Sequence, residues 1–394
     1  MSVQLFPEAT QEQRLMADSA IRVMEAEYPL TAVRELAERP EPGDEKLWRE
    51  LGGLGCFRLL AAEEHGGGTL SGNGVADAAI IAAERGARLQ PGPFTGTQVV
   101  AAALSHGGST PLHEDVLQAL LSGDAAATWA TDGLFTSGTG AGLAVQEDSG
   151  DLTVSGVLGP VQDADECDWI LVTTRAGGST RQFLLERAAG GLTLQRADGL
   201  DLTRRYFTLV LEGARIPAAA VLGDTVPGDQ GGGTALADWQ LAIAAVLSAA
   251  ESVGAMDANF ALALAYSKTR TAFGRPIGSF QGLKHLLART SLALEMAKAL
   301  VAGAAEALGS SGAPRSDAAD GLVLASMARA LVSENAVELT HNCFQVFGGI
   351  GFTWEHDQHL YMRRLASEAY LFGSPSWHRR RIWELSARTE VADA

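Results

Sequence analysis

Two short motifs combine residue types suited to an aromatic, phosphate-bearing ligand. The first, residues 270–281, reads RTAFGRPIGSFQ. Arg270 carries forked, permanently charged donors that suit a pyrophosphate, and Phe273 adds a flat apolar face three residues later. Gly274 and Pro276 favour a tight turn between two helices. On residue chemistry alone, a plain turn with a surface arginine remains the leading alternative.

The second motif, residues 343–356, reads CFQVFGGIGFTWEH. Gly348, Gly349 and Gly351 remove side chains from a stretch of backbone, which allows a flat or phosphorylated group to approach it. Gln345 supplies an amide donor and an acceptor. The structural alternative is a glycine-permitted break between two helices.

Other polar clusters are weaker candidates. The glycine-rich residues 228–233 lack the Lys-Ser/Thr pair of a nucleotide P-loop, so we interpret them as a linker or a mobile loop. His356 and His359 lack a distant third ligand, so no metal site is predicted. The basic run 378–381 is expected to form a solvated or ion-paired helix face.

Composition excludes several function classes. The chain has 394 residues, 46% of them hydrophobic and 20% charged, and a net charge of −17. Such an acidic chain is expected to repel nucleic acid and anionic lipid. We expect neither a secretory signal nor a membrane span. The widely spaced cysteines suit the reducing cytoplasm, where we place the protein, and are Cys56, Cys167 and Cys343.

The elements that must position the two motifs follow from periodicity. Apolar residues recur at helical spacing in residues 1–124 and again in 226–394, where stripes such as Val253, Met256 and Phe260 indicate a bundle of about four helices. Between them, residues 125–225 contain short β-prone runs separated by turn residues. The sequence therefore predicts an α+β protein of three domains: an N-terminal helical domain, a central antiparallel β-barrel or sandwich, and a C-terminal four-helix bundle. The strands are expected at 143–146, 152–157, 169–174, 182–185, 192–195 and 206–211.

The two motifs, about seventy residues apart, together resemble the C-terminal bundle of the acyl-CoA dehydrogenase family of flavoproteins. The resemblance extends to residues 47–68, which contain Glu63-Glu64-His65-Gly66-Gly67, and to residues 199–217 of the β-rich part. It implies the same order of helical domain, β-domain and helical bundle that the periodicity indicates.

The resemblance also implies FAD as the cofactor, bound between subunits. In that family, residues at the positions of the two motifs reach across to the FAD of a neighbouring subunit. The corresponding residues of this chain are Arg270, Phe273, Phe280, Gln281, Gln345, Gly348 and Gly349.

The chain departs from the family pattern where a subunit binds its own flavin ring. Residues 131–140 and 157–165 do not match the two family segments that hold that ring, and Gly159-Pro160 replaces a tryptophan-bearing strand. Both usual positions of the catalytic glutamate are also empty. Phe372 occupies one, and Ala244 and Ala245 occupy the other.

An unconventional base is therefore needed if the chain is catalytic by itself. Glu368 lies one helical turn before Phe372 and is the leading candidate, although a salt bridge to Arg364 is the structural alternative. Glu251 and Asp238 are weaker candidates.

Three hypotheses follow. The chain is a subunit that completes the FAD site of a homologous catalytic partner, as residues 351–361 suggest by their likeness to non-catalytic-type subunits of bacterial heterotetrameric members. Alternatively, it is a self-sufficient homo-oligomer with an unusual base, or a catalytically silent scaffold. The resemblance implies α,β-desaturation of an acyl-CoA thioester, with reoxidation by an electron-transfer flavoprotein.

Overall fold

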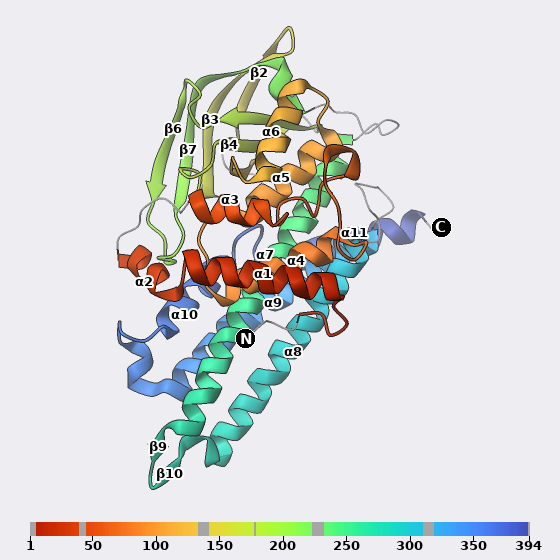
Figure 1. Ribbon diagram of the computed structural model, residues 1–394. Coiled ribbons are helices and arrows are strands. Elements are labelled where there is room, and N and C mark those ends of the chain that lie inside the picture. Colours follow the sequence, from red (N-terminus) through yellow and green to blue (C-terminus); the bar gives the residue numbers. More distant parts are fainter. Residues whose placement is uncertain are drawn as a thin grey trace.

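The computed structural model describes residues 5–38, 45–132, 142–176, 179–222, 232–309 and 319–392. The chain begins with helices, of which the first lie below the sheets and the last two lie at the level of the strands (Figure 1). α1 begins with a capping box, in which Thr10 and Gln13 exchange side-chain and backbone hydrogen bonds. These helices are α1 (Gln11–Glu27), α2 (Leu30–Glu38), α3 (Glu45–Gly53), α4 (Gly74–Ala87), α5 (Phe94–Gly107) and α6 (Pro111–Ser122), with the 3-10 turn η1 (Glu63–His65).

The middle of the chain forms two four-stranded sheets. One has the order β1-β4-β5-β8 and the other β2-β3-β7-β6. The sequence predicted a barrel or a sandwich, and the two separate sheets correspond to a sandwich. Its strands are β1 (Ala127–Asp132), β2 (Ala144–Asp148), β3 (Asp151–Gln162), β4 (Trp169–Ala176), β5 (Ser179–Glu186), β6 (Leu192–Ala197), β7 (Tyr206–Ile216) and β8 (Val221–Leu222), with η2 (Ala218–Ala220) before β8.

Strand pairing differs from the prediction in one place. β1 pairs with β4 in parallel, whereas the other strand pairs of the sheets are antiparallel. The reason is topological: β2 and β3 intervene in the sequence and belong to the other sheet, so β4 returns beside β1 in the same direction. In β3 the register shifts between Leu158 and Val161, where Pro160 has no N–H for the ladder.

The C-terminal part is helical, as predicted. The long helices α7 and α8 run together toward one end of the molecule, where β9 and β10 join them (Figure 1). The elements are α7 (Gly232–Thr269), β9 (Thr271–Ala272), β10 (Arg275–Pro276), η3 (Ile277–Ser279), α8 (Gln281–Gly309), α9 (Ala319–Phe347), η4 (Gly348–Phe352), α10 (Gln358–Glu368) and α11 (Pro375–Ala392). The predicted boundary at 225/226 and most of the glycine-rich residues 228–233 lie outside the described residues.

Glycine allows α4 and α7 to cross in backbone contact. A Cβ on Gly86 would lie 1.8 Å from the carbonyl oxygen of Glu251, and one on Gly254 would lie 1.8 Å from the carbonyl oxygen of Ala83. These reciprocal contacts fix α7 against the N-terminal helices. They also fix where Glu251, on α7, lies in the core.

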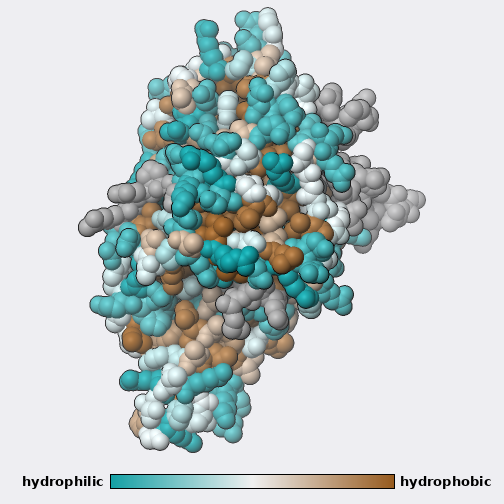
Figure 2. All heavy atoms as spheres, in the orientation of Figure 1, coloured by the Kyte–Doolittle hydropathy of each residue, from teal (hydrophilic) through white to brown (hydrophobic). Residues whose placement is uncertain are grey.

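α7 is apolar because it is the central helix of this core. Residues Thr234–Thr269 are long and apolar enough to span a membrane by length and composition, yet 89% of the most apolar window is buried inside the protein. Figure 2 shows apolar residues across the middle of one face and mainly hydrophilic residues around the sheets above.

Candidate functional site

The first motif forms a hairpin at the far end of α7 and α8. β9 and β10 are joined by Phe273 and Gly274, whose φ angles are 54° and 78°. Two consecutive positive φ values match a type I′ turn, which suits glycine but not phenylalanine. Phe273 is nevertheless 95% exposed, and its ring meets the Phe280 ring edge-on at a ring-centroid distance of 6.2 Å. An aromatic ring held outward by a strained turn is a candidate binding residue.

The second motif ends α9 and forms η4. Gly348 has a φ of 62°, and a Cβ on Gly348 or Gly349 would meet no atom within 4 Å, so both face open space. Gln345 and Gly348 line a cavity of about 480 Å³, which is named here the Gln345 cavity. Its wall also contains His341, Phe344, Phe352 and Arg363.

The fold brings the two motifs together. Tyr266 packs on Phe347 with a ring-centroid distance of 5.2 Å. The Arg270 N–H donates to the Tyr266 carbonyl at 2.9 Å, and Phe347 directly precedes Gly348. Tyr266 and Phe347 therefore connect the start of the hairpin to the glycine turn.

Positive charge is concentrated at this end of an acidic chain. Between residues 258 and 294 the sequence contains no Asp or Glu, but it contains Lys268, Arg270, Arg275, Lys284 and Arg289. All five are exposed, and within the described parts of the chain none has an ion pair. Arg275 instead lies over the Phe280 ring, with its guanidinium carbon 4.1 Å from the ring centroid. This end, named here the basic tip, is suited to an anion.

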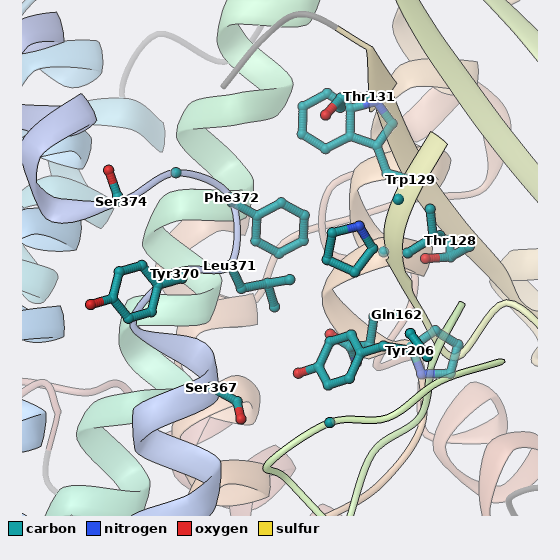
Figure 3. Close-up of a pocket in the computed structure, with 18 of the residues that line it drawn as sticks. Thr128, Trp129, Thr131, Gln162, Tyr206, Ser367, Tyr370, Leu371, Phe372 and Ser374 are labelled. Atoms are coloured by element: carbon teal, nitrogen blue, oxygen red, sulfur yellow. The ribbon is translucent and has the colours of Figure 1, made fainter. Parts of the chain in front are cut away.

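A separate cavity of about 500 Å³ lies between the sheets and the segment that follows α10. We name it the Trp129 cavity, and its wall includes Thr128, Trp129, Val161, Tyr206, Leu371 and Phe372. Figure 3 shows Trp129 and Tyr206 on one side of this space and Leu371 and Phe372 on the other. Thr131 also belongs to this wall, whereas residues 133–141, most of the predicted flavin loop, lie outside the described residues. The Trp129 indole N–H donates to Thr173 at 2.8 Å, which fixes the ring in the wall.

Phe372, at one of the empty base positions, points into this cavity (Figure 3). The backbone around it is held by buried side chains. Arg329 donates to the Leu371 carbonyl at 2.9 Å and to the Glu368 carbonyl, and His378 Nε2 donates to the Phe372 carbonyl at 3.0 Å. Phe372 itself has a φ of 56°. The segment is thus rigidly placed, but its side chain cannot accept a proton.

Glu368 belongs to a buried ion-pair cluster formed by Asp201, Arg204, Glu251, Arg364 and Glu368, each less than 7% exposed. Arg204 donates to Glu368 at 2.6 Å and also pairs with Glu251. Arg364 lies 3.8 Å from Glu368 and donates to Asp201 at 2.7 Å. The predicted salt bridge between Glu368 and Arg364 is therefore the longer of the two, and Arg204 is the main partner of Glu368.

The two glutamates of the cluster differ in pKa. Burial raises the pKa of Glu368, and the nearby charge of Glu251 adds to the effect, against the lowering by Arg204. Burial also disfavours ionised Glu251, but Arg204, Arg364 and Arg85 outweigh it and lower its pKa. Neither carboxylate lines the Trp129 cavity. This geometry favours a structural role for both, and the catalytic role of Glu368 stays a hypothesis.

Asp238, the remaining candidate base, forms an ion pair with the basic run 378–381. Asp238 lies 3.1 Å from Arg381 and 3.5 Å from Arg175. Arg379 pairs with Glu334, so the ion-paired face predicted for the basic run is present. His378 is buried, which the sequence analysis did not predict.

Sequence reasoning also missed Trp129 and Tyr206, which line the same cavity from β1 and β7. β1 was not predicted as a strand because it is short and contains alanines, threonines and a single tryptophan. Tyr206 was recognised only as the start of a strand. No local pattern distinguishes a strand residue that faces a cavity from one that faces the core.

Comparisons with known proteins agree along most of the chain. Residues 10–124 match the family model of the acyl-CoA dehydrogenase N-terminal domain, and residues 231–385 match that of the C-terminal domain. The acyl-CoA dehydrogenase IpdE2 of Mycolicibacterium smegmatis is 32% identical over 95% of this chain and 98% of its own length.

A longer relative and a solved structure extend the comparison. The acyl-CoA dehydrogenase FadE34 of Mycobacterium tuberculosis is 31% identical over 89% of this chain, and the match spans only 44% of FadE34. A solved chain of the ChsE4-ChsE5 complex from Mycobacterium tuberculosis has the same fold, with a TM-score of 0.83 and 23% identity. The match covers 98% of this chain and 99% of that chain.

Proposed function

Because this chain belongs to the acyl-CoA dehydrogenase family, we propose that it is an FAD-dependent acyl-CoA dehydrogenase subunit that completes the cofactor site of a homologous catalytic partner. The partner supplies the catalytic base and the site for the reacting acyl chain. The reaction is α,β-desaturation of an acyl-CoA thioester. The free cysteines are buried and suit the reducing cytoplasm, where we place the complex.

One asymmetry carries this proposal. The basic tip and the glycine turn, which match family positions that face a neighbour's cofactor, are exposed and free of internal ion pairs among the described residues. The Trp129 cavity, where a subunit of this family would hold its own flavin ring, instead contains Phe372 stacked on Trp129. A chain with these two features is suited to assist a cofactor seated in another subunit.

The exposed residues fit FAD in chemical terms. Arg270 offers forked donors to a pyrophosphate, without a competing carboxylate between residues 258 and 294. Open space in front of Gly348 and Gly349 leaves room for an adenosine, and Gln345 lies beside it in the wall of the Gln345 cavity. Phe273, Phe280 and Gln281 would complete the surface. FAD, when bound, supplies a hydride acceptor; this chain's residues hold it and screen its negative charge.

The FadE34 match is compatible with a second subunit. More than half of FadE34 lies outside the segment that matches this chain, which leaves room in that relative for a second unit beside the matching one. The solved ChsE4-ChsE5 complex, which shares the fold, contains two different subunits. We propose an analogous unlike pair for this chain, with acyl-CoA as substrate and an electron-transfer flavoprotein as oxidant.

Expression with and without a partner tests the proposal. The chain is purified alone and with a co-expressed homologue that carries the missing glutamate, and each visible absorption spectrum is recorded. Colourless protein alone and yellow protein in the complex, bleached by an acyl-CoA, is the expected result. Yellow protein alone that an acyl-CoA bleaches would instead support a self-sufficient enzyme. Absence of flavin in both samples would support a silent scaffold.

A further inference from the structure

We propose that the outward face of α8 binds the same face of a second copy of this chain, in an antiparallel contact with two-fold symmetry. This face is named here the α8 seam, and it consists of His285, Arg289, Leu292, Met296, Ala299, Gly303 and Glu306. None of these is a residue assigned to FAD, although Arg289 also belongs to the basic tip. The contact therefore joins two copies of this chain, in addition to the catalytic partner proposed above.

The seam points away from the protein core. Buried residues of α8 recur in steps of four and three along its core face and include Thr290, Leu294, Ala297, Val301 and Ala304. Each seam residue from Leu292 to Glu306 follows one of these by two positions, which is a rotation of about 200° around the helix axis. The seam is thus the face of α8 opposite the core.

Apolar residues occupy the middle of the seam and are open to solvent. Leu292 is 63% exposed, and Met296, one turn later, is 51% exposed. Ala299 is exposed, and a Cβ on Gly303 would meet no atom within 4 Å. Isolated exposed apolar residues are common, but successive seam positions without a charge are typical of a helix that packs on another helix.

Charge is separated along the seam. It begins with His285 and Arg289 and ends with Glu306, and all three residues are exposed. Glu295 flanks the apolar middle, where its charge is balanced by Lys298 at 3.1 Å. The seam therefore runs from basic through apolar to acidic.

An antiparallel second copy matches this pattern. In the register whose two-fold axis passes midway between Met296 and Ala299, Leu292 lies opposite Gly303 of the second copy. The same register places Met296 opposite Ala299 of the second copy, so large side chains meet small residues, as in knobs-into-holes packing. It also brings Arg289 beside Glu306 of the second copy, and two-fold symmetry repeats each contact.

This self-complementarity favours a second copy as the occupant. A parallel pair would place Arg289 beside Arg289 and Glu306 beside Glu306, which would repel. Two copies also repel at long range because each carries a net charge of −17, so the contact needs a local match of opposite charges. An unrelated partner would not require a seam whose two halves complement each other.

Sedimentation velocity on the full chain, over a range of protein concentrations, tests the contact. We expect a concentration-dependent dimer. Leu292→Glu should weaken the dimer at least about 100-fold, because two-fold symmetry counts the loss of apolar burial twice. Leu15→Glu is the matched control, since Leu15 on α1 is 57% exposed but lies outside the seam. It should leave the dimer unchanged.

A charge exchange tests the antiparallel register. Arg289→Glu places two carboxylates together at each end of the contact and should weaken the dimer about tenfold. Glu306→Arg, which places two guanidinium groups together, should have the same effect. The double variant restores opposite charges at both ends and should dimerise like wild type. Unchanged circular dichroism spectra would show that the variants are folded.

Several results would overturn the proposal. A wild-type chain that stays monomeric at all concentrations would remove the contact, and a dimer unaffected by Leu292→Glu would place it elsewhere. A double charge variant as weak as the single variants would exclude the antiparallel register. If Leu292→Glu instead blocked binding of the co-expressed homologue, the seam would be a site for the catalytic partner. These measurements need no flavin, so failure of this inference and failure of the proposed function are distinguishable.

Discussion

The Phe372 ring stacks against the Trp129 indole, with ring centroids 6.1 Å apart and an interplanar angle of 21°. The contact joins the segment after α10 to β1 across the Trp129 cavity. By the resemblance of Phe372-Gly373-Ser374 to the family motif, we expect this to be one of the family's positions for the catalytic carboxylate. On that expectation, an aromatic pair occupies the position where the chemistry would need a base.

Restoring a carboxylate at this position should not by itself create an enzyme. We expect Phe372→Glu, expressed without a partner, to show no acyl-CoA-dependent bleaching, because the proposed cofactor surface lies at the basic tip. The variant should lose about 1–3 kcal/mol of unfolding free energy through the lost stack and the introduced acid. Phe372→Leu, which removes only the aromatic contact, is the control. Flavin reduction by isolated Phe372→Glu would contradict the assignment.

Arg270→Ala should weaken flavin retention in the complex with a catalytic partner. Removal of the guanidinium deletes a charge-assisted contact worth about 1.5–3 kcal/mol, so we expect roughly 10- to 100-fold weaker FAD binding. FAD per complex is measured by absorbance after dialysis. Arg49→Ala is the control, since Arg49 forms an exposed pair with Glu45 on α3, away from the basic tip. Unchanged FAD affinity in Arg270→Ala would remove the central site residue.

Glu368→Gln should affect stability more than chemistry. The substitution leaves Arg204 with Glu251 as its remaining carboxylate partner and weakens the bond from Ser252, whose hydroxyl donates to Glu368 at 2.6 Å. Loss of one member of a buried pair costs about 3–5 kcal/mol, measured by urea unfolding. Glu334→Gln removes an exposed pair with Arg379 and should cost less than about 1 kcal/mol.

The activity of the Glu368→Gln complex separates the two roles. If Glu368 only supports the fold, turnover per folded complex stays near wild type. If it is the base, turnover falls by several orders of magnitude while FAD remains bound. The latter result would revive the self-sufficient alternative.

Local turn chemistry and periodicity explain what the sequence predicted correctly. Gly274 and Gly348 mark backbone positions with positive φ, and both turns lie where the motifs placed them. The change from helical to β-type spacing located the sheets because burial on one side imposes a period. These signals are contained within a few neighbouring residues.

Long-range pairing could not be predicted in the same way. Arg204 and Glu368 are 164 residues apart, so the choice of Arg204 over the nearer Arg364 as main partner depends on how β7 meets α10. The parallel pairing of β1 with β4 depends on two strands that cross to another sheet. Neither result leaves a local pattern in the sequence.

The buried His378 should make stability depend on pH. Burial, aided by the charges of Arg329 and Arg381 and opposed by the Phe372 carbonyl, lowers its pKa from 6.5 to about 3. The unfolded chain therefore takes up a proton as pH falls below 6.5, while the folded chain stays neutral here until about pH 3. The unfolding free energy should fall across this window by at most about 1.4 kcal/mol per pH unit from this residue.

Urea unfolding at a series of pH values measures this slope. His378→Gln should show a shallower decrease between pH 6.5 and 3 than wild type, because the titrating group is absent. His341→Gln, at an exposed position on α9, is the control and should keep the wild-type slope. An identical slope in His378→Gln would show that His378 does not contribute.

Gly254→Ala should be among the most damaging small substitutions in the chain. Its Cβ would lie 1.8 Å from the Ala83 carbonyl oxygen, so α4 and α7 would have to separate. Overpacking of this kind costs about 1–3 kcal/mol or more. Because Glu251 lies one turn away on α7, we also expect the buried ion-pair cluster to loosen. Gly303→Ala on α8 is the matched control, since nothing lies within 4 Å of its Cβ. Better helix propensity should stabilise that variant by about 0.5–1 kcal/mol, and equal melting temperatures for both variants would contradict the close crossing of α4 and α7.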